Sequence, residues 1–274
     1  MNGNDTRDEQ LAQQLNSFGN LWKGGYYEGN PLDPMGHSGY GLLGYVSVLH
    51  VVYQMCIKPY ISSQSVVLEI GPGRGAWTKT FKGAKEIWCL DALSAEHNQF
   101  HEYVGVDEKI RYIQVKDFAC KELPDNYFNY FFSFGTLCHV SFEGVSEYLR
   151  NIFPKLVSGS QCFIMVADYT KYNNAMENFD RLNALRILET ARSSNLIKKN
   201  ARKAVACVLN KLMSSATKKN MRRFELQPSK DPQNGWYNAG VNRTCELISK
   251  IGYEVISPDI GAISRDPIIH FRKP

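Results

Sequence analysis

Short apolar runs alternate with segments of helical spacing along the middle of the chain. Five such runs predict β-strands at residues 66–70, 86–90, 110–115, 128–134 and 160–167. Residues 143–156 separate the last two runs, and their apolar positions recur at the spacing of an α-helix. Strands that alternate with helices predict an α/β fold, in which a parallel sheet is covered by helices on both faces.

The C-terminal segment continues this pattern with one helix and two short strands. Residues 239–251 have helical apolar spacing, and Gly252 follows them as a candidate helix stop. Strands are predicted at residues 253–256 and 267–272. With 274 residues, the chain can bury one large core and still leave residues for a lid or an insertion.

The remaining apolar run, residues 42–57, is interrupted by His50 and Gln54. It is too short to span a bilayer and predicts a buried helix. The first twenty residues are polar and do not have the basic and then apolar order of a signal peptide. The seven cysteines form an odd set without a Cys-x-x-Cys pair, and several fall in apolar strands. Reduced core thiols of this kind predict an intracellular, cytoplasmic protein, and the shortness of the apolar run predicts no membrane span.

Residues 180–223 are too many for a simple connection and predict an insertion. Between Arg181 and Arg223 the chain carries twelve Lys and Arg residues against one acid, Glu189, so the local charge is +11 while the whole chain has +5. Apolar residues in the segment recur at helical spacing. The segment therefore predicts a pair of amphipathic helices with a basic face.

A basic face of this kind has several interpretations. It suits a phosphorylated small acceptor, a nucleic acid or an anionic membrane surface, and it also occurs as an ordinary solvated surface. The segment has no aromatic residue before Phe224, whereas proteins that bind single-stranded nucleic acids usually stack bases on aromatic rings. Nor does it contain the Trp or Phe that anchors a membrane-surface helix. A small anionic or sugar-like acceptor is the favoured partner.

The chemistry is concentrated where the first strands end. The first strand runs into Glu69-x-Gly71-x-Gly73-x-Gly75, a turn whose glycines let the main chain approach a ligand closely. The second strand stops at Asp91, twenty residues after Gly71, where a carboxylate can accept both hydrogen bonds of a ribose diol. A glycine-rich turn is weak evidence taken singly, but the acid on the next strand strengthens the case for a nucleoside site.

The third strand ends at Asp117-Phe118, an arrangement suited to the amine and the face of an adenine. Together with the glycine turn and Asp91, this pattern resembles the cofactor signature of the class I S-adenosylmethionine-dependent methyltransferases, with a small-molecule or sugar O-methyltransferase as one branch. The resemblance runs from about Val66 to the C-terminus. It implies a seven-stranded, mostly parallel Rossmann-like sheet that ends in a strand hairpin, and a loop that cradles the methionine part of S-adenosylmethionine.

The same resemblance implies which residues bind this cofactor. They lie in the glycine turn and after the next three strands, and comprise Glu69, Gly71, Pro72, Gly73, Gly75, Asp91, Ala92, Asp117, Phe118, Phe134 and Gly135.

Methyl transfer from a sulfonium is an in-line displacement, so alignment and exclusion of water are the main requirements. A hydroxyl acceptor also benefits from a general base. His139, just after the fourth strand, is the candidate base, and capping of the following helix is its alternative role. Asp168 and His37 are secondary candidates, either of which can equally serve a turn or a cap. The sequence has no tight cluster of acidic residues at the strand ends that would predict a metal site.

Further residues are predicted to contact the acceptor. The glycine- and aromatic-rich segment 22–41 predicts an ordered loop whose Tyr26, Tyr27 and His37 either close over the cofactor or anchor the N-terminal arm. Trp236 and Tyr237 lie near the predicted acceptor mouth. Arg265 either clamps a phosphate or carboxylate or pairs with its neighbour Asp266. The predicted substrate residues are thus Tyr26, Tyr27, His37, Asp168, Trp236, Tyr237 and Arg265.

These predictions combine into one hypothesis about the chain. Residues 1–60 form an N-terminal arm and lid, 61–170 the cofactor-binding half, 171–235 the basic helical insertion, and 236–274 the helix and hairpin that complete the sheet. The chain is expected to methylate a small polar acceptor at oxygen. The alternatives are an RNA methyltransferase that uses the basic insertion and a non-catalytic scaffold with the same fold, although the cofactor loop of such a scaffold is expected to be eroded.

Overall fold

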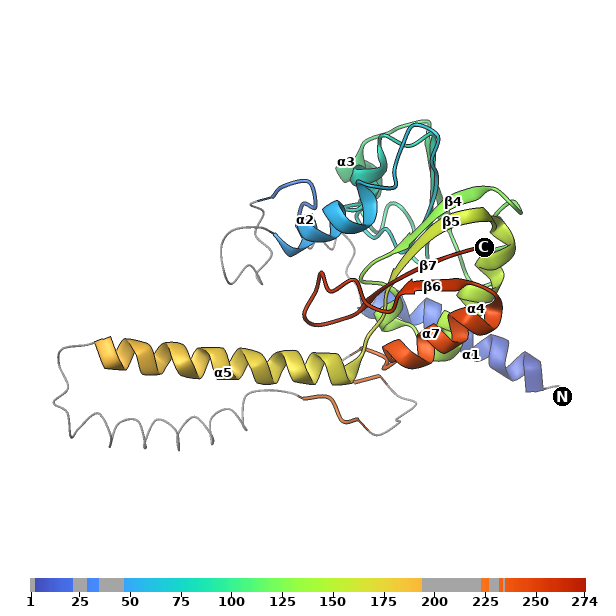
Figure 1. The fold of residues 1–274 in the computed structure, drawn as a ribbon. Helices are drawn as coiled ribbons and strands as arrows, with labels where there is room; N and C mark the ends of the chain where they lie inside the picture. Colours follow the sequence, from blue (N-terminus) through green and yellow to red (C-terminus); the bar gives the residue numbers. More distant parts are fainter. Residues whose placement is uncertain (1–2, 22–28, 35–46, 194–222, 227–231, 234) are drawn as a thin grey trace. The chain divides into compact units, whose positions relative to one another are not determined.

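The computed structural model describes residues 3–21, 29–34, 47–193, 223–226, 232–233 and 235–274. The chain divides into two compact units, of which the first comprises Met1–Ala167 with Ser229–Pro274 and the second comprises Asp168–Pro228. The first unit contains the sheet and most of the helices (Figure 1).

The sheet of the first unit has seven strands in the order β3-β2-β1-β4-β5-β7-β6. Strands β1 to β5 pair in parallel, and β7 runs antiparallel between β5 and β6. The strands are β1 (Val66–Ile70), β2 (Glu86–Asp91), β3 (Ile110–Gln114), β4 (Phe128–Ser133), β5 (Leu156–Met165), β6 (Glu254–Ser257) and β7 (Ile268–Arg272). The predicted seven-stranded, mostly parallel sheet with a terminal hairpin is confirmed.

Both faces of the sheet are buried around β1, an interior strand whose five residues are all buried. Leu68 and Ile70 belong to one core cluster and Val67 to the other, as the alternation of side chains along a strand requires. Helices cover both faces (Figure 1). They are α1 (Gly3–Leu21), α4 (Phe142–Ile152) and α7 (Val241–Ile251) on one face, and α2 (Val48–Val52), its π-helical continuation Tyr53–Ile57 and α3 (Phe100–Val104) on the other.

The boundaries of two elements differ from the prediction. The helix predicted over residues 143–156 ends at Ile152, because Pro154 has no N–H with which to continue an α-helix. Leu156 pairs with Phe128 instead, so β5 begins four residues earlier than predicted. The predicted stop after α7 is confirmed, since Gly252 has φ +114 and caps the helix. The predicted helix at 42–57 begins at Val48 within the described part of the chain.

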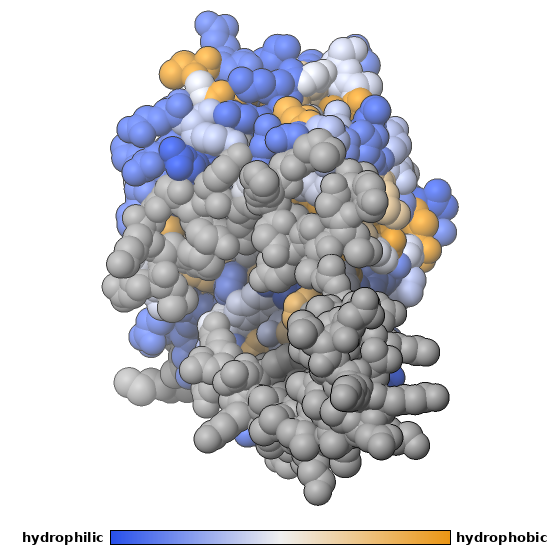
Figure 2. All heavy atoms as spheres, turned by 90° about the vertical axis from the view of Figure 1, so that its left-hand side faces the viewer, coloured by the Kyte–Doolittle hydropathy of each residue, from blue (hydrophilic) through white to orange (hydrophobic). Residues whose placement is uncertain are grey.

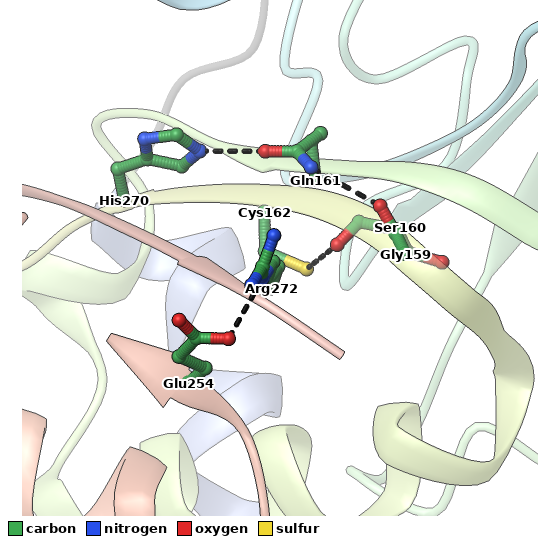
Figure 3. Close-up of polar contacts among 7 residues, drawn as sticks. All are labelled: Gly159, Ser160, Gln161, Cys162, Glu254, His270 and Arg272. Atoms are coloured by element: carbon green, nitrogen blue, oxygen red, sulfur yellow. Dashed lines mark hydrogen bonds and ion pairs between the residues drawn. The ribbon is translucent and has the colours of Figure 1, made fainter. Parts of the chain in front are cut away.

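Side-chain contacts hold the antiparallel strand β7 between its neighbours (Figure 3). Nε2 of His270 donates to Oε1 of Gln161 on β5 at 2.8 Å, since Nε2 of Gln161 itself donates to the oxygen of Gly159. On the other side, Nε of Arg272 lies 2.7 Å from Oε2 of Glu254 on β6. Such cross-strand pairs favour one register over its neighbours, because a slip by one residue would separate them.

The second unit contains the helix α5 (Tyr169–Ser193) and a short segment around Phe224. Oδ1 of Asp168 accepts a hydrogen bond from the N–H of Lys171 at 2.9 Å and so caps α5. Phe224 stacks on Tyr169 with 4.2 Å between the ring centroids. The first of the two predicted helices therefore exists but begins before residue 180, and residues 194–222, which would hold the second, lie outside the described residues. The division of the chain into four segments stays a prediction.

On the face drawn in Figure 2, the hydrophobic residues of the described chain stand singly or in small groups among hydrophilic ones. Exposed apolar side chains are scattered in this way on most globular proteins. Within the described ranges, no helix is both long enough and apolar enough to cross a membrane.

Candidate functional site

A cavity opens where the carboxyl ends of β1, β2 and β4 meet, which is the usual ligand site of an open α/β sheet. Its wall contains the turn after β1, the end of β2 and the segment after β4. The predicted cofactor residues in this wall are Gly71, Pro72, Gly73, Asp91, Ala92, Phe134 and Gly135, and His139 lines the same cavity. The fold therefore brings together residues that lie up to 68 positions apart, from Gly71 to His139.

The turn after β1 strongly favours glycine at its first position. Gly71 has φ +70, and a Cβ atom there would lie 2.0 Å from Oγ1 of Thr136. That hydroxyl donates to the main-chain oxygen of Gly71 at 3.0 Å, and the N–H of Gly71 donates to Leu90 at 2.7 Å. The turn is thus packed directly against the segment that follows β4 and is tied to β2.

Asp91 holds the turn from the second strand. Its Oδ2 accepts a hydrogen bond from the N–H of Gly73 at 3.1 Å, and its Oδ1 accepts one from the N–H of Leu93 at 2.9 Å. Burial raises the pKa of Asp91 above its ordinary value, although these hydrogen bonds oppose the shift. A carboxylate oriented by main-chain donors and lining a cavity is well placed to accept hydrogen bonds from a diol.

Glu69 lies beneath the turn and does not belong to the cavity wall. It is 2% exposed, and its Oε2 accepts hydrogen bonds from Oγ1 of Thr78 at 2.7 Å and from Sγ of Cys89 at 3.6 Å. Burial, assisted by the nearby charge of Asp91, raises the pKa of Glu69 to about 7 in spite of these hydrogen bonds. The contacts of Glu69 join β1, β2 and the 3₁₀ helix Thr78–Phe81 that follows the turn, so in this structure Glu69 has a supporting role beneath the site.

Three other predicted cofactor residues also lie outside the wall. Gly75 packs against α3, where a Cβ atom would lie 2.2 Å from Cγ2 of Val104. Asp117 is exposed, and its Oδ1 accepts from the N–H of Ala119 at 2.8 Å. Phe118 is buried behind Tyr148, which does line the cavity, with 4.6 Å between the ring centroids. Direct contacts of Glu69, Gly75, Asp117 and Phe118 with a cofactor stay predictions.

His139 stands at the end of the short 3₁₀ turn Leu137–His139. Its Nδ1 lies 2.7 Å from the main-chain oxygen of Gly235, and because a carbonyl oxygen can only accept, Nδ1 carries the hydrogen. In the neutral ring, Nε2 is then the nitrogen that accepts a proton. This arrangement fixes both the orientation and the tautomer of the imidazole, as a general base requires.

A group of aromatic and charged side chains extends from His139. Trp236 meets the imidazole edge to face, with 5.8 Å between centroids, and the Arg265 guanidinium lies 4.0 Å from the centre of the Trp236 ring. Nε of Arg265 pairs at 2.7 Å with Oδ2 of Asp266, which is fully buried. The N–H of Tyr237 donates to the oxygen of Cys138 at 2.9 Å. Three predicted substrate residues, Trp236, Tyr237 and Arg265, therefore lie beside the predicted base.

The described structure does not test the other predicted substrate residues. Tyr26, Tyr27 and His37 lie outside the described residues. Asp168 belongs to the second unit, where it caps α5. Their contacts with an acceptor remain predictions. Within the described ranges, no three His, Cys, Asp or Glu side chains come close enough together to hold a metal ion.

The cavity wall also contains residues that the sequence analysis did not select. Arg74 lies within the glycine turn and Trp77 follows it, while Leu15 and Phe18 come from α1, and Tyr148 comes from α4. The position of Arg74 and Trp77 in or beside the turn could have indicated them as residues of the cavity wall. The spacing of Leu11, Leu15 and Phe18 predicts one apolar helix face, but nothing in the sequence indicates that this face reaches the cofactor cavity.

The chemical character of the wall fits S-adenosylmethionine. Asp91 provides acceptors for a ribose diol, Arg74 provides a cation for a carboxylate, and Leu15, Phe18 and Tyr148 provide apolar surface for a purine base. Gly73 lines the cavity with no atom within 4 Å of the position that its Cβ would take, so main chain is exposed to a ligand there.

Comparisons with known proteins agree with this fit. The family described as "Methyltransferase domain" matches residues 68–164. A Listeria monocytogenes protein assigned to the S-adenosylmethionine-dependent methyltransferases is similar in structure, with a TM-score of 0.50 and 12% identity over 82% of this chain and 99% of its own. No curated protein sequence matches the chain significantly.

Two further solved structures are similar at lower scores. The mitomycin 7-O-methyltransferase MmcR has a TM-score of 0.45 and 13% identity, over 78% of this chain and 50% of its own. The N-methyltransferase NodS of Bradyrhizobium japonicum has a TM-score of 0.45 and 10% identity, over 83% of this chain and 92% of its own. Neither score supports an argument about the acceptor. Residues 68–164 thus match a methyltransferase domain, and the seven-stranded sheet that contains them has the fold of the S-adenosylmethionine-dependent methyltransferase from Listeria monocytogenes.

Proposed function

We propose that this enzyme methylates a small polar acceptor, anionic or sugar-like, at an oxygen atom, and that His139 is the general base. The observation that carries the proposal is the hydrogen bond of 2.7 Å between Nδ1 of His139 and the oxygen of Gly235. It leaves Nε2 as the basic nitrogen of an imidazole that lines the cofactor cavity. A base in this position can take the proton of a hydroxyl as the oxygen becomes methylated.

The other residues of the wall hold and align the reactants. When bound, S-adenosylmethionine supplies a methyl group on a positively charged sulfur. Asp91 would accept hydrogen bonds from the ribose, Arg74 would pair with the amino-acid carboxylate, and the apolar wall would exclude water. The proposed cofactor contacts of Glu69, Gly75, Asp117 and Phe118 would lie at the margins of this arrangement.

The preference for an anionic acceptor rests on Arg265. Its guanidinium is held between the ring of Trp236 and the buried carboxylate of Asp266, so its orientation is fixed before any ligand arrives. A guanidinium with a fixed orientation recognises phosphate and carboxylate groups well. Tyr237, and by the sequence argument Tyr26, Tyr27, His37 and Asp168, would complete the acceptor site.

The proposal is tested by screening hydroxylated acceptors for formation of S-adenosylhomocysteine. Pairs of sugars and sugar phosphates, and of alcohols and hydroxy acids, are compared at equal concentration. Preference for the anionic member of each pair, with a methyl ether as the product, supports the proposal. Methylation at nitrogen or sulfur, or preference for the neutral members, would contradict it.

RNA methylation is the second candidate function, and the observation that favours it is the local charge of +11 between Arg181 and Arg223. Methylation of unmodified RNA in the same screen would establish it. A non-catalytic scaffold is the third, and absence of binding to S-adenosylmethionine would favour it. We also propose a cytoplasmic location, in which buried thiols such as Cys56 and Cys162 stay reduced.

A further inference from the structure

The N-terminal helix α1 contributes to the wall of the cofactor cavity. Its described side chains that are buried, Leu11, Leu15 and Phe18, recur at helical spacing and are 8%, 3% and 7% exposed. Apart from the half-buried Ala12, the residues between them are polar. Leu15 and Phe18 line the cavity, whereas Leu11 packs in the core and does not. Two of the three apolar side chains that dock this helix therefore face the cofactor site.

The helix is positioned there by polar contacts as well. Oγ of Ser141, the residue that caps α4, donates to Oε1 of Gln14 at 3.0 Å (Figure 1 shows α1 and α4). Near the end of α1, a Cβ atom on Gly19 would lie 3.7 Å from Cδ2 of Leu93, another residue of the cavity wall. The position of α1 is thus linked to the segments that follow β2 and β4.

The wall has two chemically different parts. Gly73, Arg74 and Asp91 offer main-chain groups and charges, whereas Leu15, Phe18 and Tyr148 offer apolar and aromatic surface. S-adenosylmethionine has the same division, since its amino-acid and ribose groups are polar and its purine has two apolar faces. We propose that the adenine base packs against Leu15 and Phe18, and that occupation of the site strengthens the docking of α1 on the rest of the first unit.

The second part of this proposal follows from linkage. A ligand that contacts α1 only when the helix is docked must favour the docked state, and docking must favour the ligand by the same factor. The inference rests on the cofactor assignment and is independent of the acceptor and of His139.

The test compares three substitutions on one helix face, namely Leu15→Ala, Phe18→Ala and the matched control Leu11→Ala. Binding of S-adenosylhomocysteine and of adenosine to the full chain is measured by calorimetry. Leu15→Ala and Phe18→Ala are each expected to weaken both ligands about tenfold, as for loss of a buried apolar contact. Leu11→Ala, which disturbs docking without touching the base, is expected to weaken them clearly less.

Equal losses for Leu11→Ala and Leu15→Ala would overturn the contact, because they would show that only docking of the helix matters. Losses confined to S-adenosylhomocysteine would also overturn it, since adenosine carries the same base. Circular dichroism verifies that each variant folds. If Leu15→Ala does not fold, Leu15→Met serves as the conservative replacement.

Hydrogen exchange tests the coupling separately. Saturating S-adenosylhomocysteine is expected to slow exchange of the amides of residues 9–21 about tenfold or more in the native chain. Unchanged exchange in α1, alongside slowed exchange in the glycine turn, would refute the coupling and leave the cofactor assignment intact. Failure of the ligand to bind at all would refute the cofactor assignment as well, so the two failures are distinguishable.

Discussion

The main-chain N–H of Gly73 donates to Oδ2 of Asp91 at 3.1 Å, which joins the glycine turn to the end of the second strand. Asp91 therefore orients the turn in addition to offering its oxygens to the cavity. Loss of its side chain is expected to remove a ligand contact and to release the turn.

Replacement of Asp91 by alanine tests this dual role. Calorimetric titration is expected to show S-adenosylmethionine binding weakened about a hundredfold, because charge-assisted hydrogen bonds are lost. The matched control is Asp125→Ala, which breaks an exposed pair with Lys155 before the amino-terminal ends of β4 and β5, away from the cavity, and should leave binding unchanged. Similar affinities for both variants would remove Asp91 from the site.

The cation in the cavity wall is expected to distinguish cofactor fragments. Arg74→Gln should weaken S-adenosylhomocysteine about tenfold and leave 5′-methylthioadenosine, which lacks the amino-acid carboxylate, almost unaffected. Lys79→Gln is the control. The Lys79 ammonium lies 3.4 Å from the centre of the Tyr103 ring, and the Arg74 guanidinium lies near the same ring. Lys79, however, does not line the cavity. Equal loss of both ligands in Arg74→Gln would argue against a carboxylate contact.

The proposed base makes a prediction about rate and pH. His139→Ala is expected to lower kcat with the preferred hydroxyl acceptor about a hundredfold and to leave the affinity for S-adenosylhomocysteine nearly unchanged. In the native enzyme kcat/KM should fall as the pH is lowered and the histidine becomes protonated, and the variant should lose this dependence. His101→Ala, an exposed histidine on α3, is the control. A native pH profile retained in His139→Ala would rule out the assigned role.

The turn after β1 provides a stability prediction with a matched pair of glycines. Gly71→Ala should destabilise the protein by about 2 kcal/mol or more, because the new methyl group would lie 2.0 Å from Oγ1 of Thr136. Gly261 has nearly the same φ, +72 against +70, but no atom within 4 Å of the added carbon. Gly261→Ala should therefore show only the conformational strain. Urea unfolding measures the free energy of unfolding of both variants. Equal losses would mean that the turn accommodates the added methyl group without a steric penalty.

Glu69 gives a prediction about pH and stability. Its folded pKa of about 7 lies above the ordinary value of 4.5, so the folded state binds the proton more tightly than the unfolded state. The resulting stabilisation is complete below pH 4.5 and is lost as the pH rises through about 7, with a total change of about 3 kcal/mol. Glu69→Gln should flatten this part of the curve of unfolding free energy against pH. An unchanged slope would show that Glu69 does not titrate in this range.

Much of the site followed from sequence because the relevant signals are local. The apolar run of β1, the glycine turn and Asp91 at the end of β2 are read from adjacent residues, and parallel strands bring such ends together. Helix boundaries were less accurate, since Pro154 ended α4 four residues before the apolar pattern did. The role of Phe118 was harder to predict, because only packing decides that its ring lies behind Tyr148 and not in the cavity wall.

The sequence by itself determined the α/β class, the glycine turn and the acid at the end of the second strand, and it indicated the resemblance to methyltransferases that the match over residues 68–164 supports. The tertiary structure decided that α1 and Arg74 line the cavity, and that the oxygen of Gly235, 96 residues away from His139, fixes the tautomer of that imidazole. The physical reason is that strand, turn and helix signals depend on neighbouring residues, whereas contacts between distant segments depend on how whole elements pack.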